Sequence, residues 1–207
     1  MINPILKTSR FLPLLIVQFL GAFNDNLFKN MLLVMIAYKM TAQADILSSV
    51  VAGLFILPFF LFSATAGQLA DKYNRDKIAR ILKITELALM LLVGVVFYTQ
   101  SLILLVILLF LMGTQSAFFG PIKYALLPQL LKKDELLAGN GYVEGSTYIS
   151  IILGAVLGTI LNINLAISLL VICSVVGYIA SRKIPKAPAP RPELIVSKNI
   201  FKETWLN

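Results

Sequence analysis

The sequence predicts an all-α membrane protein with six transmembrane helices. Of its 207 residues, 58% are apolar and only 14% are charged, whereas about 25% are charged in a soluble domain. The mean hydropathy of +0.87 also excludes a disordered chain, which needs low hydrophobicity. The apolar runs lack the alternating polarity that barrel strands show over about 10 residues. Helices therefore account for them better than strands.

Six apolar runs each approach the length of about 20 residues that a spanning helix needs. The predicted spans cover residues 11–38, 46–70, 78–98, 102–122, 142–161 and 163–180. Very short breaks at residues 99–101 and 162–164 make the third and fourth helices, and the fifth and sixth, antiparallel neighbours. We expect residues 1–183 to form one six-helix transmembrane unit.

Basic residues lie in every second connection between the predicted spans. They are Lys7 and Arg10, then Lys72, Arg75, Lys77, Arg80 and Lys83, then Lys123, Lys132 and Lys133, and finally Arg182, Lys183, Lys186 and Arg191. The alternate connections hold only Lys39. The positive-inside rule then places both termini in the cytoplasm. The net charge of +8 is thereby explained by membrane orientation, and no nucleic-acid partner is expected.

Residues 184–207 differ in kind from the spans. Four prolines within residues 184–192 predict an extended linker, because proline cannot continue a helix. Phe201 and Trp205 are four residues apart and would share a helix face, which indicates the start of an interfacial helix. A frayed tail is the alternative.

Three polar residues interrupt the middle of the first span: Asn24, Asp25 and Asn26. An ionised aspartate at that depth costs about 2.5–3.5 kcal/mol on insertion scales, and such residues usually serve function. Lys29 follows Asp25 at the i+4 position and can pair with it. We expect a role in substrate binding or coupling, the alternative being a structural polar clamp between helices.

Three further charged positions lie near span ends. Glu86 has Lys83 three residues before it, and the pair is either structural or functional. Glu144 is predicted in the first turn of the fifth span, where it lines a pore end or caps the helix. Lys123 ends the fourth span after a Gly-Pro pair that suggests a broken helix end; the alternative is a snorkelling lysine. With no histidine and one cysteine, no metal, cofactor or catalytic centre is expected.

The connection after the second span combines small and charged residues. Its residues of interest are Gly67, Asp71, Lys72, Arg75 and Lys77. Small residues let the second helix approach a neighbour, and Asp71 can accept hydrogen bonds from Arg75 or Arg80. We interpret the set as a conformational latch, although cytoplasmic basic residues alone could also account for it. In the fifth span, Gly154 and Gly158 form a GxxxG pattern that permits close helix packing.

The connection after the second span resembles the signature of the major facilitator superfamily, with Asn74 in place of a glycine and Asp76 in place of a basic residue. Residues 19–26, 120–128 and 140–147 are similar to segments of bacterial lysophospholipid transporters. The resemblance implies one half of a twelve-helix fold, built as a 3+3 inverted repeat. The chain is then the N-terminal half, completed by a C-terminal half or by a second copy.

The resemblance also implies a function and a site. Lysophospholipids, mainly lysophosphatidylethanolamine, would cross the bacterial inner membrane by alternating access. The implied substrate-binding residues are Asp25, Asn26, Lys29, Lys123 and Glu144, with the substrate ammonium at Asp25 and its phosphate at Lys123. The fourth span lacks the arginine of many proton-coupled members, which suits a lipid facilitator. Alternatives are a generic drug or metabolite facilitator, and a membrane module serving a fused phospholipid acyltransferase whose activity would lie downstream.

Overall fold

The computed structural model describes residues 4–39 and 43–194, and these residues are helical almost throughout. The elements are η1 (Pro4–Lys7), α1 (Leu12–Lys39), α2 (Ala44–Lys72), α3 (Arg75–Thr99), α4 (Leu102–Leu130), η3 (Lys133–Glu135), α5 (Leu136–Ile160) and α6 (Ile163–Ser181). The predicted all-α class is confirmed.

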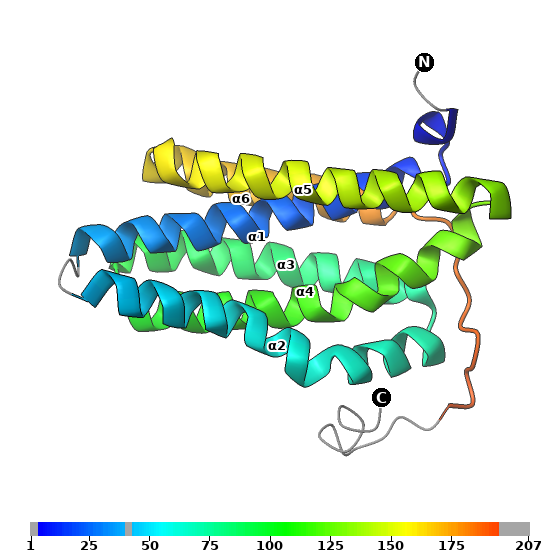
Figure 1. The fold of residues 1–207 in the computed structure, drawn as a ribbon, viewed down its shortest axis with the longest axis horizontal. Coiled ribbons are helices and arrows are strands. Elements are labelled where there is room, and N and C mark those ends of the chain that lie inside the picture. The colour runs from blue at the N-terminus through cyan, green and yellow to red at the C-terminus, as the bar shows by residue number, and fades with distance from the viewer. Residues whose placement is uncertain (1–3, 40–42, 195–207) are drawn as a thin grey trace.

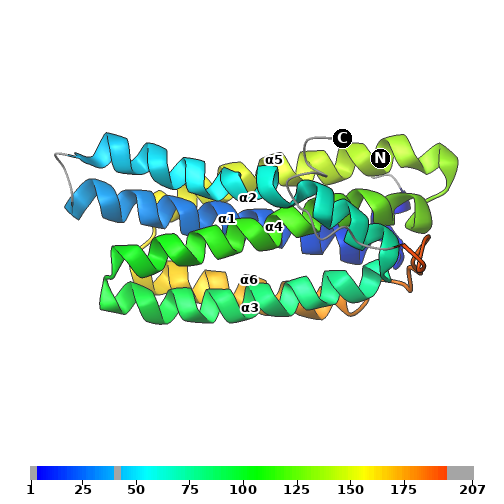
Figure 2. The same cartoon turned by 90° about the horizontal axis from the view of Figure 1, so that it is seen from below.

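The six long helices run up and down along one common axis (Figure 1). Helix α1 packs mainly against α5 and α6, while α4 packs mainly against α2 and α3. Contacts between α3 and α6 join the two groups on one side, as Figure 2 shows from below. Helices α1 and α4 therefore lie in the interior of the bundle, where side chains from several helices meet.

Five of these helices are long and apolar enough to cross a membrane. They are α2, α3, α4, the stretch Lys133–Ile160 that contains α5, and α6. Helix α1 has 28 residues, but the polar group around Asp25 lowers its hydropathy. Large apolar side chains such as Phe60, Ile103 and Ile152 are exposed on the outer surface, as expected for helices that contact lipid.

Two buried apolar clusters fill the bundle, and they occupy different levels along it. One cluster includes Phe28, Met90 and Leu109, and the other includes Leu14 and Ile122. Along α1, Val17 belongs to the second cluster and Leu27 to the first, and the buried polar residues Gln18, Asn24, Asp25 and Asn26 lie between them. The bundle therefore has a polar layer between two apolar ones.

Two predicted helix boundaries were wrong. Helix α4 continues to Leu130 and contains Pro121 and Pro128, where a broken end near residue 122 was expected. Its ribbon bends toward α5 near that end (Figure 1), because an internal proline removes a backbone hydrogen bond and kinks a helix without having to end it. Helix α5 begins at Leu136 instead of residue 142, since the preceding η3 turn is capped by Glu135. Glu144 is consequently in the third turn of α5, not in its first.

The GxxxG pattern lies where α5 packs on α1. A Cβ atom added at Gly154 would lie 2.7 Å from the carbonyl oxygen of Phe23. One added at Gly158 would lie 2.7 Å from the carbonyl oxygen of Leu27. Both glycines therefore permit an approach of the two backbones that a side chain would prevent.

Residues 184–194 have no regular secondary structure beyond a turn at residues 192–193, and they lie across one end of the bundle (Figure 1). The amide of Ala187 donates to Asp76 Oδ1 at 3.1 Å, and the amide of Ala189 donates to Asn74 Oδ1 at 3.1 Å. The amide of Arg75 donates back to the carbonyl of Ala187 at 2.9 Å. The segment is thus fastened to the α2–α3 connection. The predicted interfacial helix with Phe201 and Trp205 lies outside the described residues.

Candidate functional site

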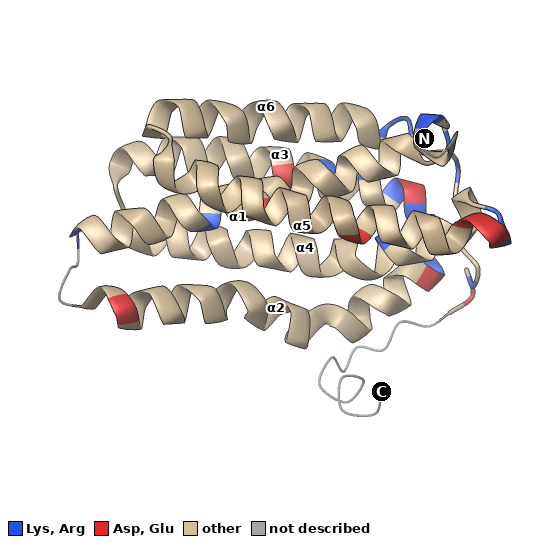
Figure 3. Ribbon diagram, turned by 45° about the horizontal axis from the view of Figure 1, so that its top comes forward, with Lys and Arg blue, Asp and Glu red and all other residues tan. Residues whose placement is uncertain are grey.

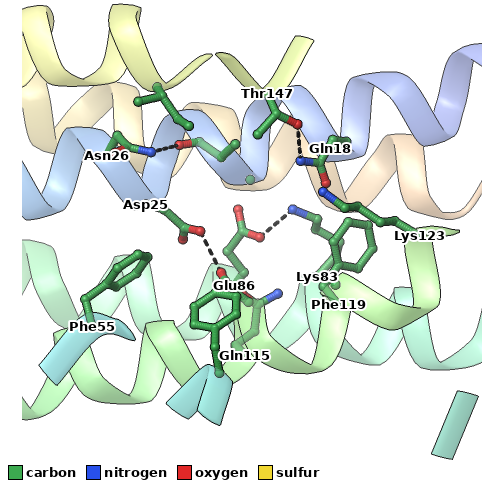
Figure 4. Close-up of a pocket in the computed structure, with 16 residues that line it drawn as sticks. Gln18, Asp25, Asn26, Phe55, Lys83, Glu86, Gln115, Phe119, Lys123 and Thr147 are labelled. Atoms are coloured by element: carbon green, nitrogen blue, oxygen red, sulfur yellow. Dashed lines mark hydrogen bonds and ion pairs between the residues drawn. The ribbon is translucent and has the colours of Figure 1, made fainter. Parts of the chain in front are cut away.

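The polar layer surrounds a cavity of about 200 Å³. Residues from α1 to α5 line it, and Figure 4 shows their side chains. The lining includes Gln18, Asp25, Asn26, Phe55, Phe59, Lys83, Glu86, Gln115, Ser116, Phe119, Lys123 and Thr147. Aromatic rings from α2 and α4 form part of the wall, charged groups from α1, α3 and α4 form another part, and neutral residues complete it.

Asp25 is the carboxylate that α1 brings to this cavity. Its side chain is buried, and Ser116 Oγ of α4 donates a hydrogen bond of 2.6 Å to its Oδ2. The predicted pair with Lys29 is not formed, because Lys29 Nζ donates instead to Asn26 Oδ1 at 3.0 Å. The same Nζ lies 5.3 Å from the centre of the Phe55 ring. A nearer amide and an aromatic face on α2 thus hold this lysine.

A buried ion pair lies beside Asp25 on α3. Lys83 Nζ and Glu86 Oε2 are 2.5 Å apart, and both side chains are 1% exposed. Asn24 Nδ2 donates to the other carboxylate oxygen, Oε1, at 3.1 Å. The Lys83 ammonium also lies 5.4 Å from the centre of the Phe119 ring. The possible pair inferred from the i,i+3 spacing therefore exists, and it forms part of the cavity wall.

Lys123 and Glu144 lie toward the end of the bundle that carries η1. Lys123 lines the cavity, and its Nζ is 4.8 Å from the centre of the Tyr124 ring. The Tyr124 hydroxyl donates to Glu144. In the part of the chain that the structure describes, Glu144 and Lys29 are outside the cavity lining. Of the five predicted substrate-binding residues, the structure brings Asp25, Asn26 and Lys123 to one cavity.

Several lining residues were not predicted from the sequence. Gln115 and Ser116 are the polar residues of α4 that face α1 and α3: Gln115 donates to the carbonyl of Leu82 at 3.3 Å, and Ser116 holds Asp25. Gln18 of α1 and Thr147 of α5 are joined by a hydrogen bond of 2.7 Å. The available signal was weak, consisting of neutral polar residues inside otherwise apolar runs.

The cavity's chemistry suits a ligand with both charges and an apolar part. Within the described ranges, it presents a carboxylate at Asp25 and an ammonium at Lys123, each without an ion-pair partner, and the internally paired Lys83 and Glu86. Among the described residues, no group of three or more His, Cys, Asp or Glu side chains could hold a metal ion. The arrangement favours binding of an organic zwitterion.

The predicted latch residues lie at the end of the bundle that carries η1. Asp71 accepts from Arg75 at 3.3 Å, and Arg75 also donates to the carbonyls of Ala70 and Ala125 at 2.9 Å each. Arg80 pairs with Asp76 at 3.1 Å and not with Asp71. Arg75 thus links α2, α3 and α4.

The remaining latch residues take no part in this linkage. Among the described residues, a Cβ atom at Gly67 would meet nothing within 4 Å, so within this part of the chain no neighbouring helix comes close to α2 at this glycine. Lys72 lies with its Nζ 5.7 Å from the Tyr73 ring centre. Lys72 and Lys77 both line a surface groove beside Pro188.

Residues 14–204 match the family model of the Major Facilitator Superfamily. The chain belongs to this superfamily. It is 30% identical over 200 residues to the lysophospholipid transporter LplT of Klebsiella pneumoniae subsp. pneumoniae, covering 92% of this chain and 47% of the relative. It is 31% identical over 200 residues to the protein of the same name from Salmonella heidelberg, covering 92% and 46%.

The protein of that name from Serratia proteamaculans is 26% identical over 215 residues, covering 99% of this chain and 50% of the relative. The chain therefore spans about half the length of the curated relatives it matches. The resemblance inferred from the three sequence segments and the charged connection is confirmed.

Proposed function

We propose that this chain forms the N-terminal half of a transporter that moves lysophospholipid across the bacterial inner membrane by alternating access. The observation that carries the proposal is the cavity in the polar layer, with Asp25 on one helix and Lys123 on another. The name of the relatives, lysophospholipid transporter, supports the substrate class. Transport needs no covalent chemistry from the protein, so we assign the chain no enzymatic role.

The headgroup of lysophosphatidylethanolamine carries an ammonium and a phosphate, which match the charges of Asp25 and Lys123 in the cavity. Asp25 attracts the ammonium, and Ser116 orients the carboxylate through its hydrogen bond. Lys123 attracts the phosphate, while Asn26 adds polar contacts at the cavity wall. The rings of Phe55 and Phe59 on α2 offer an apolar surface to the start of the acyl chain. Lys29 and Glu144 act from outside the lining by holding Asn26 and Tyr124.

In this proposal all six helices cross the membrane as a 3+3 inverted repeat, and both termini are cytoplasmic. Residues 1–183 form the transmembrane half, and residues 184–207 form its cytoplasmic linker. Helix α1 crosses despite its polar middle because those polar groups face the cavity and neighbouring helices. A second six-helix unit, either a C-terminal half or another copy, closes the cavity on its open side.

The Arg75 linkage supplies the conformational latch. It ties the end of α2 to α3 and α4 through Asp71 and two backbone carbonyls. Because Asp71 is 39% exposed, water competes for this carboxylate, and the contact can open and close at a small free-energy cost. We assign it to the state in which the cytoplasmic ends of these helices stay together.

Flux of fluorescent lysophosphatidylethanolamine into proteoliposomes tests the function. We expect Asp25→Asn to lower the rate at least tenfold, because the neutral amide loses the charge that attracts the ammonium. Asp45→Asn is the matched control, since Asp45 is an exposed aspartate in the first turn of α2, and its rate should equal that of the unaltered chain. Equal rates for all three proteins would remove Asp25 from the mechanism.

Competition separates the proposed substrate from other cargo. Unlabelled lysophosphatidylethanolamine should suppress the flux, whereas hydrophobic drugs should leave it unchanged. The opposite pattern would indicate a general drug or metabolite facilitator. Absence of flux together with lysolipid binding that feeds a phospholipid acyltransferase would instead indicate a membrane module serving that enzyme.

A further inference from the structure

A second cavity lies at the surface, away from the central one. It is a groove of about 730 Å³ between the beginning of α1 and the end of α6. Its apolar walls include Leu12 and Ile16 from α1, and Val176 and Ile179 from α6. Leu12, Val176 and Ile179 are exposed, so the groove faces outward from the bundle.

Two lysines, Lys7 and Lys183, border this groove, and its lining among the described residues contains no acidic side chain. Within residues 4–39 and 43–194, neither ammonium is part of an ion pair. Nearby Arg10 differs, because Glu135 neutralises it at 2.6 Å. The groove therefore combines an apolar floor with two uncompensated positive charges at one end.

The position of the groove matches the boundary between lipid tails and headgroups. Lys7 lies at the end of η1 and Lys183 two residues after α6 ends. Basic residues gather at this end of the bundle, and the N-terminal region lies beside the end of α6 (Figure 3). Basic pockets of this kind between transmembrane helices are known to suit anionic phospholipid headgroups.

We propose that this groove binds one anionic diacyl phospholipid. Its phosphate lies between the ammonium groups of Lys7 and Lys183, and an acyl chain lies along Ile16, Val176 and Ile179. A second copy of the chain fits less well, because a symmetric contact would bring the same two lysines of each copy together without acidic partners. The bound lipid holds the start of α1 against the end of α6. This proposal is independent of the transported substrate.

Native mass spectrometry of the full chain, purified from vesicles of phosphatidylglycerol and phosphatidylcholine in equal amounts, tests the proposal. We expect one retained phosphatidylglycerol per chain and no enrichment of phosphatidylcholine. Lys7→Gln/Lys183→Gln should weaken this binding on the order of 25-fold, since each lysine near an anionic lipid contributes about fivefold. The charge-matched control is Lys132→Gln/Lys133→Gln, whose lysines border neither this groove nor the central cavity.

The arginine variant Lys7→Arg/Lys183→Arg separates loss of charge from misfolding and should retain the lipid. Millimolar inorganic phosphate should not displace it, because the apolar walls hold the acyl chain. The proposal is overturned if the glutamine variant and the unaltered protein retain the lipid equally, if both lipids are retained equally, or if phosphate displaces the bound lipid. It is also overturned if the unaltered protein is a dimer without bound lipid and the glutamine variant is a monomer.

Discussion

Two regions of the bundle carry ion pairs with nearly the same sequence spacing but in different surroundings. In the central polar layer, Lys83 and Glu86 are three residues apart, 1% exposed each, and linked at 2.5 Å. At the end of the bundle that carries η1, Asp71 and Arg75 are four residues apart, 39% and 10% exposed, and linked at 3.3 Å. A local pattern in the sequence does not distinguish these two pairs.

Burial makes the two pairs energetically different. An exposed pair contributes about 0–1 kcal/mol, because water competes with it and salt screens it. A buried pair adds little compared with apolar residues, but removing one member leaves an unpaired charge that costs about 3–5 kcal/mol. The central pair therefore makes the polar layer rigid, whereas the pair at the end can exchange partners.

The largest expected effect comes from breaking the central pair. Lys83→Met should lower the free energy of unfolding by about 3–5 kcal/mol, because Glu86 is left charged and buried. Denaturant titration in detergent, followed by circular dichroism, measures the change. Lys83→Met/Glu86→Leu is the control and should recover most of the loss, since both charges are gone. A single variant as stable as the unaltered chain would contradict the comparison.

An intermediate effect is expected at Asp76, a buried aspartate at the end of the bundle that carries η1. Asp76 is 4% exposed and accepts the Ala187 amide, and hydrogen bonds to charged groups contribute about 1.5–3 kcal/mol. Asp76→Asn should therefore loosen residues 184–194, seen as faster hydrogen exchange at the Ala187 amide. Asp134→Asn, at an exposed aspartate, should leave that exchange rate unchanged. Slow exchange in the Asp76 variant would show that the segment is held by other contacts.

The smallest effect belongs to the pair whose carboxylate, Asp71, is exposed to water. Asp71→Asn should change the free energy of unfolding by less than about 1 kcal/mol, in the same denaturant titration. Raising the salt concentration should reduce even this difference, because exposed charges are screened. A loss comparable with that of Lys83→Met would mean that the latch contributes strongly to the stability of the folded bundle.

Much of the fold could be predicted from the sequence because long apolar runs mark helices of membrane-spanning length directly. The limits of α1 and α6 agree with the predicted spans to within one residue. The start of α5 was missed because the apolar run that predicted this span begins only at residue 142, whereas the helix begins at Leu136, directly after the η3 turn. The end of α4 was missed because the Gly-Pro pair was expected to break the helix, whereas Pro121 lies inside it; an internal proline can kink a helix without ending it.

The site could be predicted only where a charge interrupts an apolar run. Asp25 stands out for that reason, and the structure places it in the cavity. Ser116 does not stand out, because a neutral hydroxyl is inexpensive to bury and its partner is 91 residues away in the sequence. The partner of Lys29 depends on side-chain conformation, which spacing along the helix does not determine. Long-range partners and rotamers are thus the missing information.

Binding selectivity tests the central claim most directly, namely that Asp25 recognises the substrate ammonium. The two ligands to compare are lysophosphatidylethanolamine and its N-acetyl derivative, which share the acyl chain and the phosphodiester, while the derivative has a neutral amide in place of the ammonium. We predict that the unaltered chain and the Asp45→Asn control bind the first at least tenfold more tightly. In Asp25→Asn the ratio of the two dissociation constants should fall to about one. An Asp25→Asn protein that keeps the full preference would contradict the account.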